Sequence, residues 1–418
     1  MKNPVWLGID FGTSGARSIA IDAQGQKLAE CRVQNLSQTP SGWRSALVQL
    51  FEQLPTELCQ RLTGIAIDGT SSTVMLCDST GEALLEPLMY DDDRALKVLD
   101  QVRQIAPPNH TVVSATSSFA KLLWFAQQPE FKHAHVLAHQ ADWLAFLLHG
   151  RLGTSDYHNA LKLGYDPEIL DYPDWLNAHQ YRSLLPDVRT PGETIGPILR
   201  SWSDRFGIPA RCQIHDGTTD SIAAFLASGA TEIGEAVTSL GSTLVVKLLS
   251  NVRIDDARYG IYSHRLGNKW LVGGASNTGG AVLRSFFSDD ELIKLTAKLD
   301  PTYFTGLNYY PLTKPGDRFP INNPTLEPRL SPRPEDPALF LQGLLEGMAQ
   351  IEADAYKLLE TLGCGEVCRI YTAGGGAQNA VWTQLRAAAT GKLMTCAVDV
   401  EAAIGVARLI QSSNYLQR

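Results

Sequence analysis

The chain of 418 residues is longer than one hydrophobic core usually supports, so its length predicts two domains. It contains 44% hydrophobic and 19% charged residues, and its formal net charge of −8 argues against a nucleic-acid partner, because binding to the phosphate backbone needs a basic face. No apolar run is long enough to span a bilayer and residues 1–10 lead directly into a strand, so we expect no membrane partner and no targeting segment.

The cysteines indicate a reducing compartment. There are seven, an odd and scattered number that does not predict a disulfide framework. Cys364 and Cys368 form a close pair, but no second pair or nearby histidine completes a zinc site. We therefore expect a cytoplasmic protein; a plastid location would require that a transit peptide has been removed.

The first predicted element is a hairpin with a glycine-rich turn. Residues 5–9 are an apolar run that ends at Asp10, and residues 17–21 alternate between polar and apolar, so a turn between two strands is predicted. A P-loop would open a helix instead and is not expected. Gly12, Thr13 and Ser14 could present N–H groups to an anion, with Asp10 beside them suited to Mg²⁺. An ordinary tight hairpin with an aspartate explains the same residues and remains an alternative.

A second polar loop follows a later strand. Residues 64–67 form a predicted strand, and residues 68–72 follow it at its carboxyl end, which is where open α/β sheets bind ligands. The other elements expected in this half are strands at 27–33 and 74–77, helices at 46–62, 118–128 and 141–148, and a loop over a cleft at 154–165.

Asp220 stands at the start of a helix predicted from the apolar residues 222–226. A carboxylate there can cap the helix, which alone would explain it. The preceding Gly-Thr-Thr turn also allows the carboxylate to meet a hydroxyl and a phosphate, so both interpretations stand.

The hairpin of residues 5–21 has a counterpart in the second half of the chain. Residues 236–240 and 244–249 are predicted strands, joined by Gly241, Ser242 and Thr243. Two similar hairpins more than two hundred residues apart imply two related domains, each offering a phosphate loop to a shared cleft. We place the boundary near residues 228–234.

The last segments add a long core helix and two glycine-rich turns. Pro337 introduces the clearest helix, which carries one apolar stripe and ends at Gly363. Other expected features are a strand at 270–272, a helix from about residue 281, an irregular wrapping segment at 301–337, a strand at 369–373 with a glycine-rich turn and helix after it, and a small-residue helix from 401 that packs against this turn.

Taken together, these pieces resemble the FGGY family of carbohydrate kinases. The resemblance runs through nearly the whole chain and is closest to the short xylulokinase-like or ribulokinase-like pentulose kinases of cyanobacteria and plants. The segments that carry it are GIDFGTSGAR at 8–17, LMYDDDRA at 88–95, KLLWF at 121–125, GTTD at 217–220, SLGST at 239–243, GDRFP at 316–320, AGGGAQN at 373–379 and EAAIG at 401–405.

The resemblance implies an α/β fold of two ribonuclease H-like domains, as in actin and hexokinase, at 1–228 with the sugar site and at 229–418 with the ATP site. It implies that Asp220 is the catalytic base and that Asp10 contacts the sugar and hydrated Mg²⁺. The implied phosphate loops are Gly12, Thr13 and Ser14, and Gly241, Ser242 and Thr243; the implied adenosine contacts are Gly375, Gly376 and Asn379.

One loop departs from the xylulokinase pattern. Where xylulokinases usually carry Met-His-Gly, residues 68–72 read Asp-Gly-Thr-Ser-Ser, which is closer to ribulokinase-like patterns. Ser71 is then the expected sugar contact of this loop and Lys162 a further candidate, beside Asp10, Thr13, Ser14 and Asp220.

We therefore expect an ATP- and Mg²⁺-dependent kinase, monomeric or homodimeric, that converts D-ribulose to D-ribulose 5-phosphate. The alternatives are a D-xylulose kinase and a weakly active, sugar-responsive ATPase of the same fold. A silent sensor and an actin-like ATPase with protein partners are further hypotheses; Asp10 and Asp220 argue against the sensor, and the sugar-loop resemblances argue against the actin-like ATPase.

Overall fold

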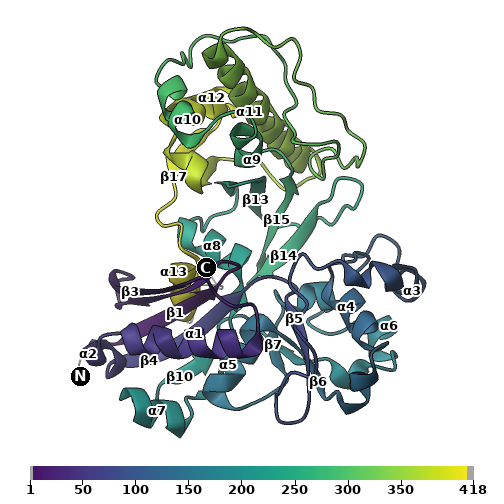
Figure 1. Cartoon of the computed structure of the whole chain (residues 1–418), viewed down its shortest axis with the longest axis vertical. Helices are drawn as coiled ribbons and strands as arrows, with labels where there is room; N and C mark the ends of the chain where they lie inside the picture. Colours follow the sequence, from purple (N-terminus) through teal and green to yellow (C-terminus); the bar gives the residue numbers. More distant parts are fainter. Residues whose placement is uncertain (1–2, 412–418) are drawn as a thin grey trace. The chain divides into compact units, whose positions relative to one another are not determined.

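The computed structural model describes residues 3–411 and divides into two compact units. Among these residues, unit 1 comprises 3–227 and 401–411, and unit 2 comprises Ser228–Val400. Within the described residues no helix is long and apolar enough to cross a membrane. Each unit is built around its own mixed β-sheet with helices on it (Figure 1).

The sheet of unit 1 has seven strands, in the order β3-β2-β1-β4-β10-β9, with β11 also paired to β4. The first hairpin is antiparallel, whereas β1 and β4 run parallel, as do β4 and β10. The strands are β1 Val5–Phe11, β2 Gly15–Ile21, β3 Lys27–Gln34, β4 Leu62–Gly69, β9 Thr194–Pro197, β10 Gln213–His215 and β11 Thr218–Thr219.

Alternation along β1 separates the two faces of this sheet. Its residues Val5, Leu7, Ile9 and Phe11 are buried in one core with α1 (Pro40–Gln53) and α5 (Gln140–His149). Gly8 faces the other side, where a Cβ would lie 1.9 Å from a carbonyl oxygen of α13 (Ala402–Gln411). Asp10 follows Gly8 by two residues and therefore belongs to the α13 side of the sheet.

A second lobe of unit 1 has a hydrophobic core of its own. Its elements are β5 Val74–Cys77, α3 Leu99–Ile105, α4 Ser118–Phe125, β6 Val136–His139, β7 Thr154–Asp156, α6 Asp174–Asn177 and β8 Asp187–Arg189. Unit 1 also contains α2 Thr56–Cys59, α7 Arg200–Phe206 and all but the last residue of α8 Asp220–Ser228.

The sheet of unit 2 has the order β14-β15-β13-β12-β16-β17, again with an antiparallel hairpin whose first strand pairs in parallel with a later strand. The two hairpins predicted to be related thus occupy equivalent positions in their sheets. The elements are β12 Glu235–Leu240, β13 Leu244–Ser250, β14 Tyr262–Leu266, β15 Lys269–Ser276, α9 Gly280–Arg284, α10 Asp289–Thr296, α11 Pro337–Thr361, β16 Arg369–Ala373, α12 Ala380–Thr390 and β17 Leu393–Cys396.

A buried ion pair joins the two long helices of unit 2. Arg386 on α12 donates to both carboxylate oxygens of Glu352 on α11, with Nε–Oε2 and Nη2–Oε1 distances of 2.5 and 2.7 Å. Thr238 on β12 donates to the same carboxylate, and Thr372 on β16 accepts from Arg386. Because these partners satisfy the buried charges, the network fixes α12 relative to the sheet.

Two expectations about local structure are wrong in part. The helix expected at 46–62 is instead α1 and α2, because Thr39 caps the start of α1, Pro40 occupies its first turn, and Pro55 interrupts the helical backbone before α2. The segment 154–165, expected as a loop, contains β7 and the short 3₁₀ helix Ala160–Leu163.

The chain end also differs from expectation. We expected the second domain to extend to residue 418 and its last helix to pack against the turn at 374–379, whereas α13 packs with β1 and β2 in unit 1. Gly405 explains part of this, because a Cβ there would lie 1.8 Å from the carbonyl oxygen of Ala223 on α8. Such a close approach depends on glycine.

Candidate active site

Strand register gathers three carboxyl groups at one edge of the unit 1 sheet. Asp10 on β1 is paired with Asp68 on β4, and Asp68 is in turn paired with Thr218 on β11. Asp220 is the first residue of α8, two positions after Thr218. The predicted residues Asp10 and Asp220 are therefore neighbours, and Asp68 lies between their strands.

Asp68 was not predicted as a site residue. Its side chain is fully buried, and among the described residues no N–H or O–H group donates to either oxygen. Burial, with the neighbouring carboxylates, holds the pKa of Asp68 well above its usual range. Burial also raises the pKa of Asp10 to about 6, against the lowering effects of a hydrogen bond that protonated Asp68 donates to Asp10 and of the Arg17 charge. The two carboxyl groups therefore hold a shared proton in preference to two full charges.

Arg17 connects this edge to α13. It is paired in register with Asp10 and forms ion pairs with Glu401 and, at 3.5 Å, with Glu30. Glu401 immediately precedes α13, so the EAAIG segment contributes an anchor for Arg17.

The first phosphate-loop candidate, residues 12–14, has its carbonyl groups tied to the protein. Nε2 of Gln38 donates to the carbonyl oxygens of Gly12 and Thr13 at 3.3 and 2.6 Å, and the N–H of Leu36 donates to that of Ser14. Thr13 and Ser14 are exposed. The N–H of Gly12 donates to the carbonyl oxygen of Gly15 at 3.0 Å, so of the predicted N–H groups those of Thr13 and Ser14 are left for an anion.

Gln38 was not predicted, and nothing in its sequence context marks it. Its Oε1 accepts from Nε1 of the buried Trp43 at 2.9 Å, which fixes the orientation of the amide. We expect Gln38→Ala to lower kcat/KM for ATP by about tenfold, because a loosened loop misplaces its N–H groups. Initial-rate kinetics over an ATP series measure this.

The matched control is Gln53→Ala, which removes a glutamine that binds the backbone of Arg32 through both amide atoms in the same unit. It should leave kcat/KM within about twofold. Equal losses in the two variants would show that Gln38 acts only on general stability.

The loop at 70–72 contains the predicted sugar contact and an unpredicted support. Ser71 is half-buried, and its hydroxyl makes no hydrogen bond within the described part of the chain. Ser72 has a positive φ of 65° and a buried hydroxyl without a partner there. Its carbonyl oxygen accepts from Nζ of the buried Lys121 at 2.8 Å. Lys121, from the KLLWF segment, thus holds this loop in a strained conformation.

Lys162 lies on the 3₁₀ helix Ala160–Leu163 and is half-buried. Burial lowers the pKa of Lys121 to about 7; the Asp92 carboxylate opposes this shift and the nearby Lys162 charge adds to it. Lys162 is therefore close enough to the Lys121 ammonium to interact with it.

Asp216, two residues before Thr218, is a buried acid outside the predicted site. Burial raises the pKa of Asp216 to about 9, with Asp156 and Asp142 adding to the shift. The native state therefore retains a proton that the unfolded chain releases near pH 4, so the free energy of unfolding falls as pH rises from about 4 towards 9.

We expect Asp216→Asn to flatten this dependence. Between pH 5 and 8 the variant should gain stability over the wild type by up to about 1.4 kcal/mol per pH unit. Urea unfolding at several pH values measures it. Asp78→Asn is the control, because hydrogen bonds from Thr80 lower the pKa of half-buried Asp78 and place its titration below this range. Parallel wild-type and Asp216→Asn curves would contradict the expectation.

The second phosphate-loop candidate, residues 241–243 of unit 2, is also held by hydrogen bonds to its carbonyl oxygens. The N–H groups of Gly280 and Ala281 donate to the carbonyl oxygens of Gly241 and Ser242 at 2.9 and 3.1 Å. At Gly279, with φ 142°, a Cβ would lie 2.7 Å from the Ser242 oxygen. The start of α9 therefore fixes this loop through its carbonyl side.

Asp317, from the GDRFP segment, stabilises the turn that precedes α9. Its buried carboxylate accepts from the Ser276 hydroxyl at 2.8 Å, the Asn277 N–H at 2.7 Å and the Tyr310 hydroxyl at 2.6 Å. The segment thus shapes the turn between β15 and α9.

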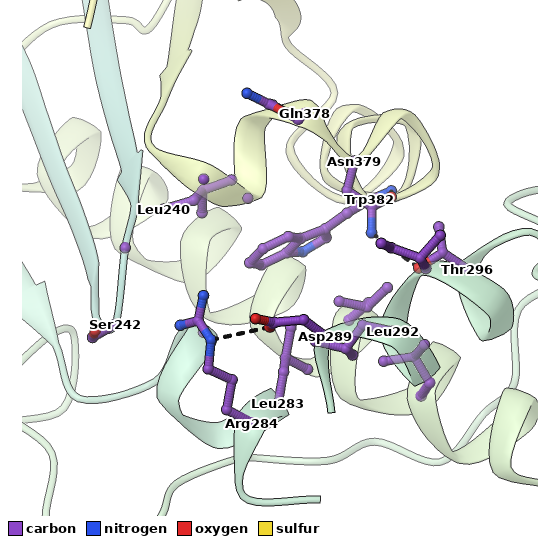
Figure 2. Close-up of a pocket in the computed structure, with 17 residues that line it drawn as sticks. Leu240, Ser242, Leu283, Arg284, Asp289, Leu292, Thr296, Gln378, Asn379 and Trp382 are labelled. Carbon is purple, nitrogen blue, oxygen red and sulfur yellow. Dashed lines mark hydrogen bonds and ion pairs between the residues drawn. The ribbon is translucent and has the colours of Figure 1, made fainter. Parts of the chain in front are cut away.

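A pocket of about 790 Å³ opens beside this loop in unit 2 (Figure 2). It brings together the predicted residues Gly241, Ser242, Gly375, Gly376 and Asn379, whereas Thr243 does not line it. Its other walls come from α9, α10, α11 and Trp382.

The glycines Gly375 and Gly376 of the turn at 374–379 differ in the space around them. A Cβ at Gly376 would lie 2.5 Å from the Trp382 ring, whereas one at Gly375 would meet nothing within 4 Å. Asn379 caps α12 by accepting from the Trp382 N–H at 2.9 Å, and its Nδ2 donates to Thr296. The close approach of residue 376 to Trp382 therefore depends on glycine, whereas the space beside Gly375 is open.

Comparison with known proteins places this geometry in a family. The model of the FGGY carbohydrate kinase N-terminal domain matches residues 5–227, and that of the C-terminal domain matches residues 236–410. The chain is 22% identical to a xylulose kinase of Staphylococcus epidermidis, covering 93% of this chain and 83% of that protein. It is 24% identical to an L-fuculokinase of Salmonella typhi, covering 93% and 87%.

Solved structures agree on the fold. The protein described as a "xyloylose kinase" from Brucella ovis matches with a TM-score of 0.85 at 20% identity, covering 99% of this chain and 90% of that one. A gluconate kinase from Lactobacillus acidophilus matches with a TM-score of 0.85 at 17% identity, covering 100% and 91%. The predicted two-domain α/β fold is confirmed, and the chain belongs to the FGGY family of carbohydrate kinases, which are sugar phosphotransferases.

Proposed function

We propose that this carbohydrate kinase transfers a phosphoryl group from ATP to the terminal hydroxyl of a free ketopentose, and that this ketopentose is D-ribulose. The observation that carries the proposal is the meeting of Asp10, Asp68 and Asp220 at one sheet edge of unit 1. Neighbouring carboxyl groups with different pKa values can accept a proton from a sugar hydroxyl.

In this proposal Asp220 accepts the proton as the sugar oxygen attacks the phosphoryl group. It is half-buried, and its Oδ1 accepts from the N–H of Ser221 at 2.7 Å, which orients the carboxylate. Asp10 contacts the sugar, and Thr13 and Ser14 offer N–H groups and hydroxyls to sugar and phosphate. Buried Asp68 keeps the local charge low by sharing a proton with Asp10.

Mg²⁺ fits these residues only together with the nucleotide. No group of three or more potential ligands within residues 3–411 could hold a metal ion by itself. Mg²⁺ commonly binds through one or two carboxylates, water and substrate phosphates, and Asp10 can serve in such a set. When bound, the ion supplies positive charge that stabilises the phosphoryl oxygens.

In unit 2, the pocket beside Gly241 and Ser242 supports an ATP site. It joins the loop of Gly241 and Ser242 to a space lined by Gly376, Trp382 and apolar residues of α10. A nucleotide needs both features, an anion site and a slot for its base.

The choice of sugar rests on the loop at 70–72, where the hydroxyls of Ser71 and Ser72 lack partners among the described residues. Such hydroxyls suit the recognition of a sugar hydroxyl. D-xylulose is the second candidate, because several relatives at low identity are named xylulose kinases.

The test is ADP formation by the full chain with Mg²⁺ and ATP, in the presence of D-ribulose, D-xylulose, L-fuculose, gluconate or no sugar. We expect turnover that depends on a ketopentose. Sugar-independent hydrolysis alone, or phosphorylation of gluconate alone, would overturn the proposal.

A further inference from the structure

Two charged side chains face each other at the unit 2 pocket. Of the 17 residues that line it, Arg284 at the end of α9 and Asp289 at the start of α10 are the charged ones. Figure 2 shows both directed into the pocket, with Nε of Arg284 3.3 Å from Oδ1 of Asp289. No sequence motif predicted either residue.

Arg284 lies beside the loop at 241–243. Its Nη1 would be 3.4 Å from a Cβ built at Gly280. The N–H of Gly280 in turn donates to the carbonyl oxygen of Gly241 at 2.9 Å. The guanidinium group is therefore next to the peptide that holds this loop, at the end of the pocket that Gly241 and Ser242 line.

The ion pair with Asp289 leaves most of Arg284 uncommitted. The contact uses Nε alone, and within the described part of the chain neither terminal nitrogen makes a hydrogen bond. Both side chains are exposed, at 61% and 77%, so the pair contributes little to stability. A polyphosphate carries more negative charge than one carboxylate and matches the guanidinium fork, so it would displace Asp289.

We propose that Arg284 recognises the phosphate groups of the nucleotide in unit 2 and that Asp289 is the competing counter-ion that occupies Arg284 when the pocket is empty. This rests on the proposed function, because it assumes that the pocket binds ATP. It orients the ligand, with phosphates toward Ser242 and Arg284 and the base toward Trp382 and Asn379. Asp289 lowers the affinity for ADP and so favours its release.

The structural alternative is that the pair only tethers α9 to α10. The two explanations differ in which ligands are affected. A phosphate contact changes the binding of ADP and of an ATP analogue but not of adenosine, whereas a tether changes all three because it shapes the whole pocket.

Calorimetric titration of the full chain with adenosine, ADP and a non-hydrolysable ATP analogue separates them. We expect Arg284→Gln to weaken ADP and the analogue by about 10- to 100-fold, as loss of a charge-assisted contact does, and to leave adenosine within about twofold. Asp289→Asn should tighten ADP and the analogue by a few fold. The control Arg258→Gln removes an arginine of unit 2 paired with Asp256 away from the pocket lining, and should change none of the affinities.

Equal weakening of all three ligands in Arg284→Gln, or of none, would overturn the inference, as would weaker ADP binding in Asp289→Asn. Should Arg284→Gln melt well below the wild type, Arg284→Lys keeps the charge without the fork and should show an intermediate loss confined to ADP and the analogue. A wild-type chain that binds no nucleotide would overturn the proposed function itself, whereas an active kinase whose Arg284 variants bind normally would overturn only this inference.

Discussion

Replacing Asp220 by asparagine should lower kcat by roughly 10² or more, because an amide cannot accept the proton of the attacking hydroxyl. The KM values for sugar and ATP should change far less. The fold should persist, because the asparagine side-chain oxygen can still accept from the N–H of Ser221, as Oδ1 of Asp220 does. Steady-state kinetics with D-ribulose and ATP, together with a melting curve, measure both statements.

The control is Asp174→Asn, another aspartate that begins a helix of unit 1, in this case α6. If helix-start electrostatics were the whole role of Asp220, the two variants would lose comparable stability and both would keep their turnover. A folded Asp220→Asn protein with near-normal turnover would remove Asp220 from the mechanism and leave the helix-capping interpretation.

The hairpins and their turns could be predicted because they are local. Asp10 ends an apolar run, glycine and hydroxyl residues follow, and an alternating run returns; the same order recurs at Gly241, and β1, β2, β12 and β13 form where this order predicts them. The resemblance to a family then assigned roles to these turns.

The contacts that join residues distant in the sequence could not be predicted. Asp68 belongs to the candidate site because the register of β4 places it opposite Asp10, and Gln38 because its amide reaches back to residues 12 and 13. Neither the pairing of Asp68 with Asp10 nor the contact of Gln38 with residues 12 and 13 produces a periodicity or spacing in the sequence. A comparison of polar residues at the ends of parallel strands would have singled out Asp68, since Asp10 and Asp68 share that position, whereas no local signal marks Gln38.

The place of α13 shows the same limit. Its small residues indicated close packing, and the glycine contacts at Gly8 and Gly405 bear out that part. The predicted packing partner, the turn at 374–379, was wrong, because the sequence of an apolar helix does not reveal which sheet the helix covers. Contacts between residues 8 and 403 are determined by the path of the whole chain.

The second large effect concerns the choice between two sugars that differ in the configuration of one hydroxyl. We expect kcat/KM to be about tenfold or more higher for D-ribulose than for D-xylulose, because an unpaired polar group in a buried site costs on the order of 1–3 kcal/mol. The hydroxyl of Ser71 has no partner among the described residues, and Lys121 fixes the adjacent Ser72 carbonyl at 2.8 Å. A hydroxyl on a rigid loop can distinguish two epimers, whereas one on a mobile loop would adapt to both.

Kinetics of the wild type, Ser71→Ala and Ser72→Ala on both sugars decide this prediction. Ser71→Ala should lose the preference mainly through a lower kcat/KM for D-ribulose, because removing the hydroxyl deprives only the matched epimer of its partner. Ser72→Ala is the matched comparison, since it removes a neighbouring buried hydroxyl and leaves the backbone carbonyl that Lys121 binds. If only Ser72→Ala lost the preference, Ser72 and not Ser71 would be the residue that distinguishes the two sugars. A wild type that prefers D-xylulose tenfold would show that the loop at 70–72 selects the opposite epimer, and the D-xylulose kinase alternative would then replace the D-ribulose assignment.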